Sequence, residues 1–523
     1  MAFELLCYAT VALIALYYYF TAKFNFWKDR SVRGPKPIPV FGNVFWPMIG
    51  NISIAKYLQK LHNEYKDEPM IGLFVRRTPY LIIQDPELIK DVLIKDFSKF
   101  ANRGFLKQEI AEPLSQHLFS LEVERWRPLR TQLSPVFTSG KLKGIFSLIC
   151  ECAERIESYV DTLIAKGEPI EVRELAARYT TDVIGSCAFG IEMNSLSDKE
   201  SEFRRMGKEI FATHWKAILK FRMKECVGEL YDILGYILPP DKVNVFIERI
   251  TIETLNYRKE HNIVRHDFMN ALLELRNNPE KVKDIKLTDT LLAAQAFLFF
   301  AAGFETSSTT ISNALYELAL NEEIQRKLRE EIKEFDAKNA GDWKYETIKQ
   351  MSYLDKVFKD LPICSRNLFV ISILLSSHFV PFIETLRKYP PLAFISRETT
   401  DNYTFSNTKV SLEKCMRVWI PVFSIHRDPN IYSDPDKFDP ERFSKEAVDA
   451  RHPMHYLPFG HGPRNCIGAR FAIYQTKIGL IKILHNYEVH VCEKTPIPYE
   501  LNPFAFVICP KGGLYLNIIK SKN

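Results

Sequence analysis

The stretch FGHGPRNCIGA, residues 459–469, presents a single cysteine, Cys466, in a glycine-rich loop directly before a helical pattern. A lone cysteine is most often a small buried hydrophobic residue. Here the glycines allow close approach of the backbone to a large flat group. A helix N-terminus and the neighbouring Arg464 both favour the thiolate over the thiol. These are the conditions for a sulfur atom that binds a metal.

The other ligands of such a metal would have to come from a macrocycle. No second cysteine or histidine stands at zinc-like spacing from Cys466. A haem brings its own nitrogen ligands and takes an axial ligand, such as a cysteine thiolate, from the protein. We therefore interpret Cys466 as the axial ligand of a haem iron.

Length and composition predict a large folded protein in a reducing compartment. The chain has 523 residues, of which 46% are hydrophobic and 26% charged, and this excludes disorder as its main state. Its net charge of +6 is too small to argue for a nucleic-acid partner and suits a membrane surface equally well. The cysteines are scattered without CxxC pairs, so we expect reduced thiols in a domain that faces the cytosol.

Residues 1–22 predict a transmembrane signal anchor. The run from Leu5 to Ala22 is broken only by two threonines and is just long enough to cross a thin bilayer. It is followed by the basic residues Lys23, Lys28, Arg30, Arg33 and Lys36. This flanking charge predicts a single-pass signal anchor, with the rest of the chain in the cytosol. A cleaved signal peptide is the alternative, although the n-region carries Glu4 and no positive charge.

Two further segments follow the anchor. Residues 23–43 are basic and proline-rich and predict a linker, in which GPKPIP at 34–39 forms a stiff, extended spacer. From residue 44 to 523 helical periodicity dominates and no other linker is evident. We therefore expect one mostly helical domain with small sheets, and strands near residues 81–83 and 514–518.

A second signal lies in residues 291–310, LLAAQAFLFFAAGFETSSTT. Up to Phe304 this stretch carries one polar side chain, Gln295, which predicts a helix buried on all sides. Gly303 and the hydroxyl residues 306–310 then break the local rules of a core helix and can bend it. Such a conflict indicates a functional groove, with a merely tolerated polar patch as the alternative.

The cysteine loop matches a known family pattern. The matching residues are Phe459, Gly462, Arg464, Cys466 and Gly468. In this spacing the chain resembles the cytochrome P-450 monooxygenases, and most closely the microsomal group of insect detoxification and vertebrate drug-metabolising enzymes. The resemblance runs to about Leu516 and implies a mainly α fold with small β-sheets, preceded by one transmembrane helix. It also implies haem b, bound through Cys466, and O2 and NADPH-derived electrons as co-substrates.

The resemblance assigns further residues around the haem. Glu305 and Thr306 would organise water and deliver protons during oxygen activation, with Ala302 beside the haem. The haem propionates would accept hydrogen bonds from Trp126, Arg130, Arg397 and Arg464. A structural network would join Glu384, Arg387 and Arg442. Each arginine taken singly is more often a solvated surface residue.

The resemblance also implies an aromatic, apolar cavity for lipophilic substrates such as xenobiotics or endogenous lipids and hormones. Its lining would be Phe105, Phe119, Phe211, Phe297, Phe300, Ala301, Leu392, Phe394, Phe504 and Phe506. For each phenylalanine alone, ordinary core packing is at least as common an explanation.

Electrons would come from another protein, because no GxGxxG stands between a strand and a helix. The resemblance implies NADPH-cytochrome P-450 reductase as the partner, with cytochrome b5 as a further candidate. A basic docking face could include Arg125, Arg127, Arg464 and Arg470, although scattered solvated charges are the more usual explanation.

Two other functions stay open. One is a haem-bearing protein that sequesters lipophiles without turnover, and the other is a haem-thiolate isomerase that needs neither dioxygen nor a reductase. The pair Glu305-Thr306 argues against the isomerase.

Residues 360–383, DLPICSRNLFVISILLSSHFVPFI, depart from the family pattern. In the family, a segment like 353–359 runs directly into one like 384–391 as one helix. Without the intervening residues a single apolar face would be formed by Leu354, Val357, Phe358, Leu386 and Tyr389. We therefore expect a non-native insertion, from unspliced sequence or a faulty gene model. A genuine insertion at the membrane interface is the alternative.

Overall fold

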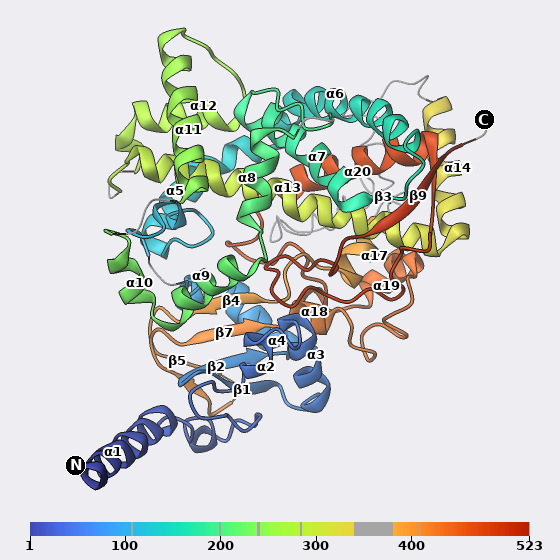
Figure 1. Cartoon of the computed structure of the whole chain (residues 1–523). Coiled ribbons are helices and arrows are strands. Elements are labelled where there is room, and N and C mark those ends of the chain that lie inside the picture. Colours follow the sequence, from blue (N-terminus) through green and yellow to red (C-terminus); the bar gives the residue numbers. More distant parts are fainter. Residues whose placement is uncertain are drawn as a thin grey trace. The chain divides into compact units, whose positions relative to one another are not determined.

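The computed structural model contains two compact units, each built from several segments of the chain (Figure 1). The described residues are 1–105, 108–197, 200–237, 241–282, 285–338, 380–406 and 408–521. Unit 1 comprises Met1–Gly104, Leu392–Pro435 and Arg451–Asn465. Unit 2 comprises Phe105–Pro391, Asp436–Ala450 and Cys466–Asn523. Because the chain passes repeatedly from one unit to the other, no single linker marks their boundary in the sequence.

Unit 1 is organised around a four-stranded sheet of order β1-β2-β7-β4. Its elements are α1 (Ala2–Thr21), η1 (Lys28–Arg30), α2 (Phe45–Met48), α3 (Ile54–Glu64), β1 (Met70–Val75), β2 (Thr78–Ile83), α4 (Pro86–Lys90), η2 (Asp91–Lys95), η3 (Phe97–Phe100), β4 (Ile395–Glu398), β5 (Tyr403–Thr404), β6 (Ser411–Leu412), β7 (Arg417–Ile420), α18 (Val422–Ile425) and η12 (Pro453–His455). β1 and β2 form an antiparallel hairpin, β7 pairs parallel with β2, and β4 pairs antiparallel with β7. The nearly continuous burial of β1 and β2 is typical of strands covered on both faces.

Unit 2 is mainly helical. Its elements are η4 (Pro113–Ser115), α5 (Val123–Leu133), η5 (Ser134–Phe137), α6 (Ser139–Ile164), β3 (Ile170–Glu171), α7 (Val172–Ile184), η6 (Gly185–Phe189), α8 (Glu202–Ile210), α9 (Trp215–Cys226), α10 (Gly228–Leu234), α11 (Lys242–Glu260), α12 (Phe268–Asn277), η7 (Pro279–Val282), α13 (Asp289–Leu320), α14 (Glu322–Lys338), α17 (Val380–Lys388), η11 (Pro440–Phe443), α19 (Lys445–Asp449), α20 (Ala469–Asn486), β8 (Tyr487–His490) and β9 (Tyr515–Lys520). The strands expected near residues 81–83 and 514–518 are confirmed as parts of β2 and β9.

The core of unit 2 forms around α13, which packs against α7, α11 and α20 (Figure 1). The expected helix is present and most of its side chains are buried, but it is not covered on all sides, because Ala302 is exposed and residues 297–299 are half-buried. A Cβ at Gly303 would overlap Ile184 of α7. Close packing of the two helices therefore accounts for this glycine, which the sequence alone presented only as a break of local rules.

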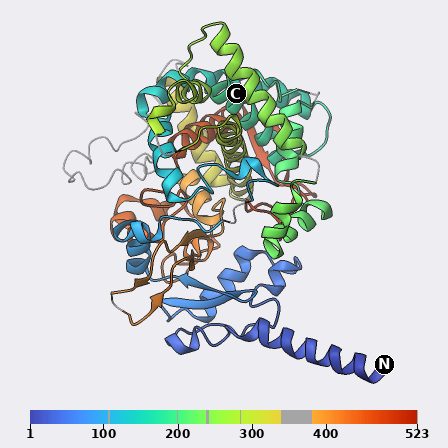
Figure 2. The same ribbon diagram turned by 90° about the vertical axis from the view of Figure 1, so that its left-hand side faces the viewer.

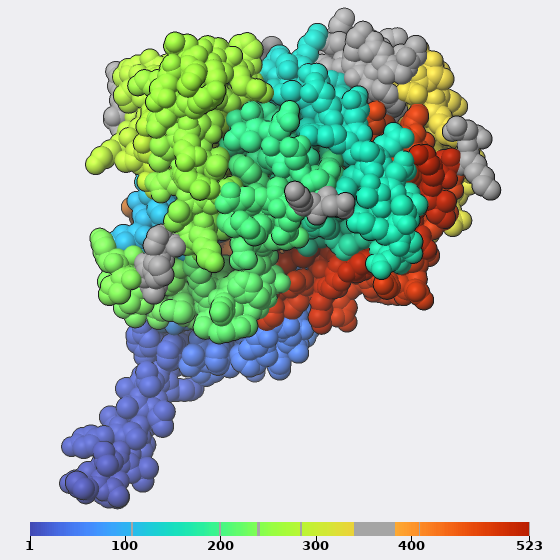
Figure 3. Space-filling view, turned by 45° about the horizontal axis from the view of Figure 1, so that its top comes forward, coloured from blue at the N-terminus to red at the C-terminus, as the bar shows by residue number. Residues whose placement is uncertain are grey.

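α1 is a candidate transmembrane span. Among the described residues two helices, α1 and α13, are long and apolar enough to cross a membrane. In α13, 61% of the apolar 18-residue stretch is buried inside the protein, whereas in α1 0% of the corresponding stretch is buried. α1 extends away from the strands of unit 1 (Figure 2) and stands clear of its surroundings in the space-filling view (Figure 3). The apolar face of α13 is thus a protein core, whereas that of α1 is available to lipid.

The predicted linker at residues 23–43 differs from the structure. Trp27 and Val32 belong to the hydrophobic core of unit 1, and Phe24 and Phe26 pack against that core. The hydrophobic core of unit 1 therefore includes residues that directly follow α1, whereas the sequence analysis expected the folded domain to begin at residue 44.

The predicted insertion, residues 360–383, lies outside the described residues as far as residue 379. Its last residues, from Val380, form the first turn of α17, in which Phe382 and Ile383 are buried.

Candidate active site

Two glycines shape the loop that precedes Cys466. Gly460 and Gly462 have φ angles of 68° and 74°, in the left-handed region where a Cβ is unfavourable. A Cβ at Gly462 would also overlap the carbonyl oxygen of Leu93 in η2. Gly462 is therefore required both by its backbone conformation and by the close approach of η2 within unit 1.

Cys466 lies in unit 2, two residues before Gly468, the N-cap of α20. Its side chain is exposed, so core packing does not account for it. Burial lowers the pKa of Arg130 on α5, and the nearby Cys466 opposes that shift. Trp126, one turn before Arg130, is buried. An exposed sulfur close to a helix N-terminus and within electrostatic reach of a guanidinium is well placed to act as a thiolate ligand.

Unit 1 contains a buried cluster of arginines. Arg397 on β4 is 1% exposed, and its Nη1 donates to the carbonyl of Ser396 at 2.9 Å. Its Nε has no hydrogen-bond partner, and the guanidinium pairs with no carboxylate, among the residues that the structure describes. Burial and the charge of Arg103 lower the pKa of Arg397 to about 9. Arg103 in turn donates to the carbonyl oxygen of Arg464 at 3.0 Å, and Arg464 is also buried.

This cluster provides a test of the expected haem. A buried cation without a carboxylate is costly unless an anion accompanies it. The two carboxylates of a haem meet that requirement, and a planar guanidinium binds a carboxylate through two parallel hydrogen bonds. The Arg397 environment therefore fits the role that the resemblance gave it.

One stripe in the middle of α13 is less covered than the residues around it. Ala302 is exposed and Thr306, one turn later, is half-buried. The Thr306 hydroxyl donates to the Ala302 carbonyl at 2.7 Å. The next two carbonyls also accept side-chain donors, Gly303 from Gln475 Nε2 at 3.1 Å and Phe304 from Thr180 Oγ1 at 3.0 Å. Side-chain donors thus bond three successive carbonyls of α13, one from within the hydroxyl-rich segment and two from neighbouring helices, while α13 runs unbroken through this segment.

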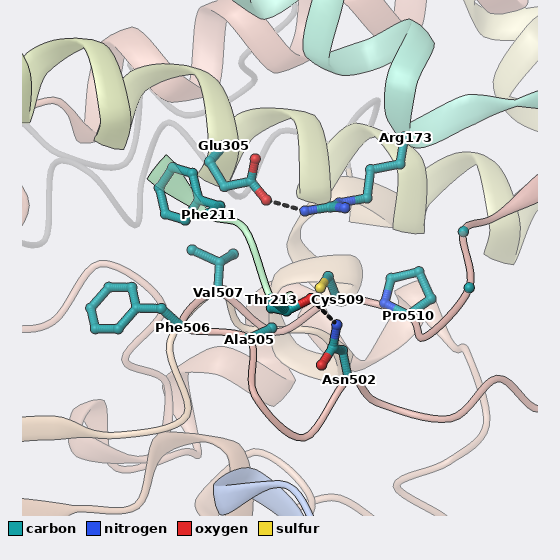
Figure 4. A pocket seen from close by; sticks show the side chains of 12 residues that line it. Arg173, Phe211, Thr213, Glu305, Asn502, Ala505, Phe506, Val507, Cys509 and Pro510 are labelled. Atoms are coloured by element: carbon teal, nitrogen blue, oxygen red, sulfur yellow. Dashed lines mark hydrogen bonds and ion pairs between the residues drawn. The ribbon is translucent and has the colours of Figure 1, made fainter. Parts of the chain in front are cut away.

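The adjacent residue, Glu305, points into a pocket of about 150 Å³ in unit 2 (Figure 4). Its carboxylate forms an ion pair with Arg173 of α7. Burial alone would lower the pKa of Arg173, but Glu305 and neighbouring acidic groups raise it overall. Across the pocket, Asn502 Nδ2 donates to Thr213 Oγ1 at 3.3 Å. The pocket lining therefore includes Glu305 and does not include Thr306.

Several of the expected aromatic residues meet in unit 2. The rings of Phe105 and Phe119 lie 5.2 Å apart, and those of Phe119 and Phe506 lie 6.3 Å apart. Phe297 stacks on His117 with centroids 5.9 Å apart. These residues are exposed or half-buried, which suits a surface for an apolar ligand.

Other expected pocket residues are placed differently. Phe300 is fully buried against Phe189 and Phe203, so it is a core residue rather than part of a cavity wall. Phe394 packs against Trp419 beside the sheet core of unit 1. The remaining four are Phe211, which lines the Glu305 pocket and contacts Phe304, buried Ala301, and half-buried Leu392 and Phe504.

The expected structural network is assembled in unit 2. Arg387 binds Glu384 through two hydrogen bonds, Nε to Oε2 at 2.6 Å and Nη2 to Oε1 at 2.7 Å. Arg442 Nε lies 3.6 Å from Glu384 Oε1. Burial raises the pKa of Glu384, against the opposing effect of Arg387. Since breaking a buried pair costs about 3–5 kcal/mol, this network anchors α17 to the segment around η11.

The expected basic docking face is corrected in part. Arg464 is buried and so cannot contribute to a docking surface. Arg125 forms ion pairs with Glu109 and Glu122. Arg127 is exposed, and Arg470 donates to the hydroxyl of Ser139 at 3.0 Å.

Four polar residues of these regions were not identified from the sequence. They are Arg103, Arg173, Thr180 and Gln475, each of which contacts a residue far away in the chain. No local pattern marks the two arginines. The one available signal was the polar side chain inside a helix, since Gln475 and Thr180 lie on buried faces where a polar group needs a partner.

Comparison with known proteins agrees with this geometry. The profile of the family Cytochrome P450 matches residues 32–361 and 382–517. The chain is 39% identical to probable cytochrome P450 6a14 of Drosophila melanogaster, over 95% of this chain and 95% of that protein. It is also 39% identical to cytochrome P450 6A1 of Musca domestica, over 98% of this chain and 97% of the relative. Cytochrome P450 6k1 of Blattella germanica shares 36% identity over 99% and 98% of the two chains.

These relatives are insect enzymes, in agreement with the expected resemblance to the insect detoxification group. The two matched ranges include the cysteine loop, the less covered stripe of α13 and the Arg397 strand. The chain belongs to the cytochrome P450 family and is therefore a membrane-type monooxygenase with haem b as its cofactor.

Proposed function

We propose that this chain inserts one oxygen atom of O2 into lipophilic small molecules, with electrons that a reductase transfers from NADPH. The observation that carries the proposal is the exposed Cys466 at the start of α20, with Arg130 within electrostatic reach. When bound, the haem supplies the redox chemistry that activates dioxygen. Substrates would be apolar, because the ring cluster of Phe105, Phe119 and Phe506 offers little hydrogen bonding.

Each site residue then has a defined task. Cys466 would bind the haem iron through its sulfur, and Phe459, Gly462 and Gly468 would shape the loop that presents this sulfur. In unit 1, the buried Arg397 and Arg464 would donate hydrogen bonds to a haem carboxylate. Arg103 acts as a positioning residue, because its hydrogen bond to the Arg464 carbonyl fixes the backbone there.

Proton supply would be divided between two faces of α13. The Thr306 hydroxyl, bonded to the Ala302 carbonyl, can donate or accept a proton on the less covered stripe. Glu305 faces the pocket that contains Thr213 and Asn502, where water can reach its carboxylate. Glu305 would therefore collect protons from the solvent side, and Thr306 would deliver them at the haem side.

Replacement of Thr306 by alanine tests this division. We expect Thr306→Ala to bind haem and substrate normally but to lose about 100-fold in product formation, at the lower end of what a positioned proton donor contributes. NADPH would still be consumed, with peroxide as the product. The measurement is the ratio of product to NADPH.

Thr310→Ala is the matched control, because Thr310 makes the same kind of hydroxyl-to-carbonyl bond, at 2.8 Å to Thr306, but is buried. An unchanged product-to-NADPH ratio in Thr306→Ala would remove this residue from proton delivery.

Arg397→Met should separate haem retention from protein stability. The charged Arg397 is unfavourable in the folded chain, as its lowered pKa indicates, so its removal should not lower the Tm of the haem-free protein. Haem should dissociate roughly ten- to a hundredfold faster, since a hydrogen bond to a charged group contributes about 1.5–3 kcal/mol. Haem transfer to apomyoglobin and calorimetry measure the two effects.

The control for this variant is Arg417→Met on the neighbouring strand, where the arginine lies 3.7 Å from the carboxylate of Glu398. It should leave the rate of haem transfer unchanged. A loss of stability in haem-free Arg397→Met, with haem retention intact, would contradict the anion-binding role.

We further propose that α1 is a single-pass anchor in the endoplasmic reticulum membrane and that the rest of the chain faces the cytosol. The basic residues after α1 support this orientation. Alkaline carbonate should leave the full-length chain in the membrane pellet and should release a chain that lacks residues 2–21. Release of the full-length chain would disprove the anchor.

NADPH-cytochrome P-450 reductase is the proposed electron donor, with cytochrome b5 as a second donor. Exposed Arg127 could contact an acidic partner, whereas Arg464 is excluded by its burial.

A further inference from the structure

Gln295 is the single polar residue of the stretch 291–304, and its side chain connects α13 to a segment far away in the chain. It is 1% exposed. Its Oε1 accepts a hydrogen bond from Leu118 N at 3.0 Å, and its Nε2 donates to the Gln116 carbonyl at 2.8 Å. Nε2 also donates to the Leu291 carbonyl, one turn earlier in α13, at 2.9 Å. The amide therefore uses both of its donor hydrogens and its acceptor oxygen inside unit 2.

The two bonds to this segment lie on either side of His117. Residues 116–122 connect η4 to α5 and form neither helix nor strand. Leu118 is buried, whereas His117 and Phe119 are half-buried. Because Gln295 binds the carbonyl before His117 and the N–H after it, it fixes the peptide groups on both sides of that residue. The directions of the His117 and Phe119 side chains therefore depend on the Gln295 amide.

Both side chains belong to the ring cluster of unit 2. His117 stacks on Phe297 of α13, with centroids 5.9 Å apart and 25° between the ring planes. The ring of Phe119 lies 5.2 Å from that of Phe105 and 6.3 Å from that of Phe506. Flat rings held at fixed angles present faces on which a planar aromatic molecule can stack. The order of residues 116–119 therefore bears on which ligands the cluster accepts.

We propose that Gln295 is a positioning residue for substrate selectivity and that the segment it holds favours flat aromatic molecules over flexible aliphatic ones. This inference rests on the proposed monooxygenase function. Gln295 acts through the backbone of residues 116–118 and does not touch the substrate, because it is buried and its amide is bonded to the protein. Rings that are already ordered lose less freedom when a ligand stacks on them. A flexible aliphatic chain gains little from that order, since it has no plane to stack.

Gln295→Met removes the three hydrogen bonds and keeps a long, unbranched side chain. We expect the preference for phenanthrene over dodecane to fall about fivefold, within the range that ordering a side chain costs in binding. The measurement is a competition assay, in which the full-length, haem-loaded chain with reductase and NADPH receives both substrates together. Because both products come from the same enzyme molecules, their ratio does not depend on the amount of active protein.

A second readout requires no turnover. Hydrogen–deuterium exchange is followed in the peptide of residues 114–121, in the full-length, haem-loaded protein. The Leu118 N–H should exchange roughly tenfold faster in Gln295→Met than in the wild type, because it loses the acceptor that opposes local opening.

Gln325→Met is the matched control. Gln325 on α14 is 3% exposed, and its amide makes the same set of bonds. It donates to the carbonyls of Leu318 and Val489, at 3.1 and 2.8 Å, and accepts from Val489 N at 2.8 Å. These partners lie at the end of α13 and in β8, outside the ring cluster. Both variants lose a buried glutamine, but the product ratio and the exchange of Leu118 should change only in Gln295→Met.

An unchanged product ratio in Gln295→Met would overturn the inference. An equal change in Gln325→Met would also overturn it, because a general loss of stability would then account for the effect. If Gln295→Met does not retain haem, Gln295→Asn takes its place in the same assays, since a side chain that is one carbon shorter keeps a polar group but cannot hold both bonds to residues 116–118.

Failure of the proposed function gives a different result. If the wild type forms no oxygenated product, the monooxygenase function is contradicted and with it the basis of the inference. If the wild type forms both products and the Leu118 N–H exchanges equally fast in the wild type and in Gln295→Met, the function stands and the positioning role of Gln295 is overturned.

Discussion

Cys466→Ser should abolish the strongly red-shifted Soret band that a ferrous thiolate haem gives with carbon monoxide. Serine keeps the size of the side chain but removes the sulfur that donates electron density to the iron. Monooxygenase activity should fall below detection in the same preparation. The measurement is a reduced, carbon monoxide-bound difference spectrum, normalised to total haem.

Cys415→Ser is the matched control, because Cys415 is also exposed but lies in the turn between β6 and β7 rather than before α20. It should keep the full thiolate band. A Cys466→Ser protein that retains the band would show that another residue ligates the iron.

Deletion of residues 360–383 should raise haem incorporation from a low level to the full amount expected for one haem per chain. We propose that these residues are not native, and the match to the family profile supports this, since it stops at residue 361 and resumes at 382. Downstream, Glu384 and Arg387 are intact and paired. The deletion would place residues 353–359 directly before Glu384, which is the arrangement found in the family.

The comparison requires both chains to be expressed under the same conditions and their haem-to-protein ratios measured. A shorter deletion, residues 360–379, keeps the described first turn of α17 and shows whether buried Phe382 and Ile383 belong to the native helix. Equal haem content in the full chain and in the longer deletion would contradict the proposal. Sequencing of the transcript across the junction shows directly which chain the cell makes.

Local patterns predicted the elements whose signal lies within one segment. The apolar run before Phe304 predicted a buried helix because a side chain on any face of such a helix needs an apolar neighbour. The glycines before Cys466 were interpreted as room for a flat group, whereas Gly462 is required by its φ angle and by the carbonyl of Leu93.

Contacts between distant segments could not be predicted in this way. Arg173 reaches Glu305 across 132 positions of the chain, and Gln475 reaches Gly303 across 172. Arg397 resembles any surface arginine in the sequence, and only its burial beside Arg103 distinguishes it. Phe300 and Phe119 are equivalent as residue types, so tertiary packing alone decides that one is core and the other half-buried.

The central claim is that this chain transfers one atom of dioxygen to a lipophilic substrate. The most direct measurement reconstitutes the membrane-bound chain with reductase and NADPH and supplies phenanthrene as a lipophilic probe under 18O-labelled dioxygen. The account predicts reductase-dependent oxygen consumption and a hydroxylated product that carries a single 18O atom. A rearranged product without oxygen uptake would identify an isomerase, and tight binding of lipophiles across a panel, without product or oxygen uptake, would identify a sequestering protein; either result would contradict the account.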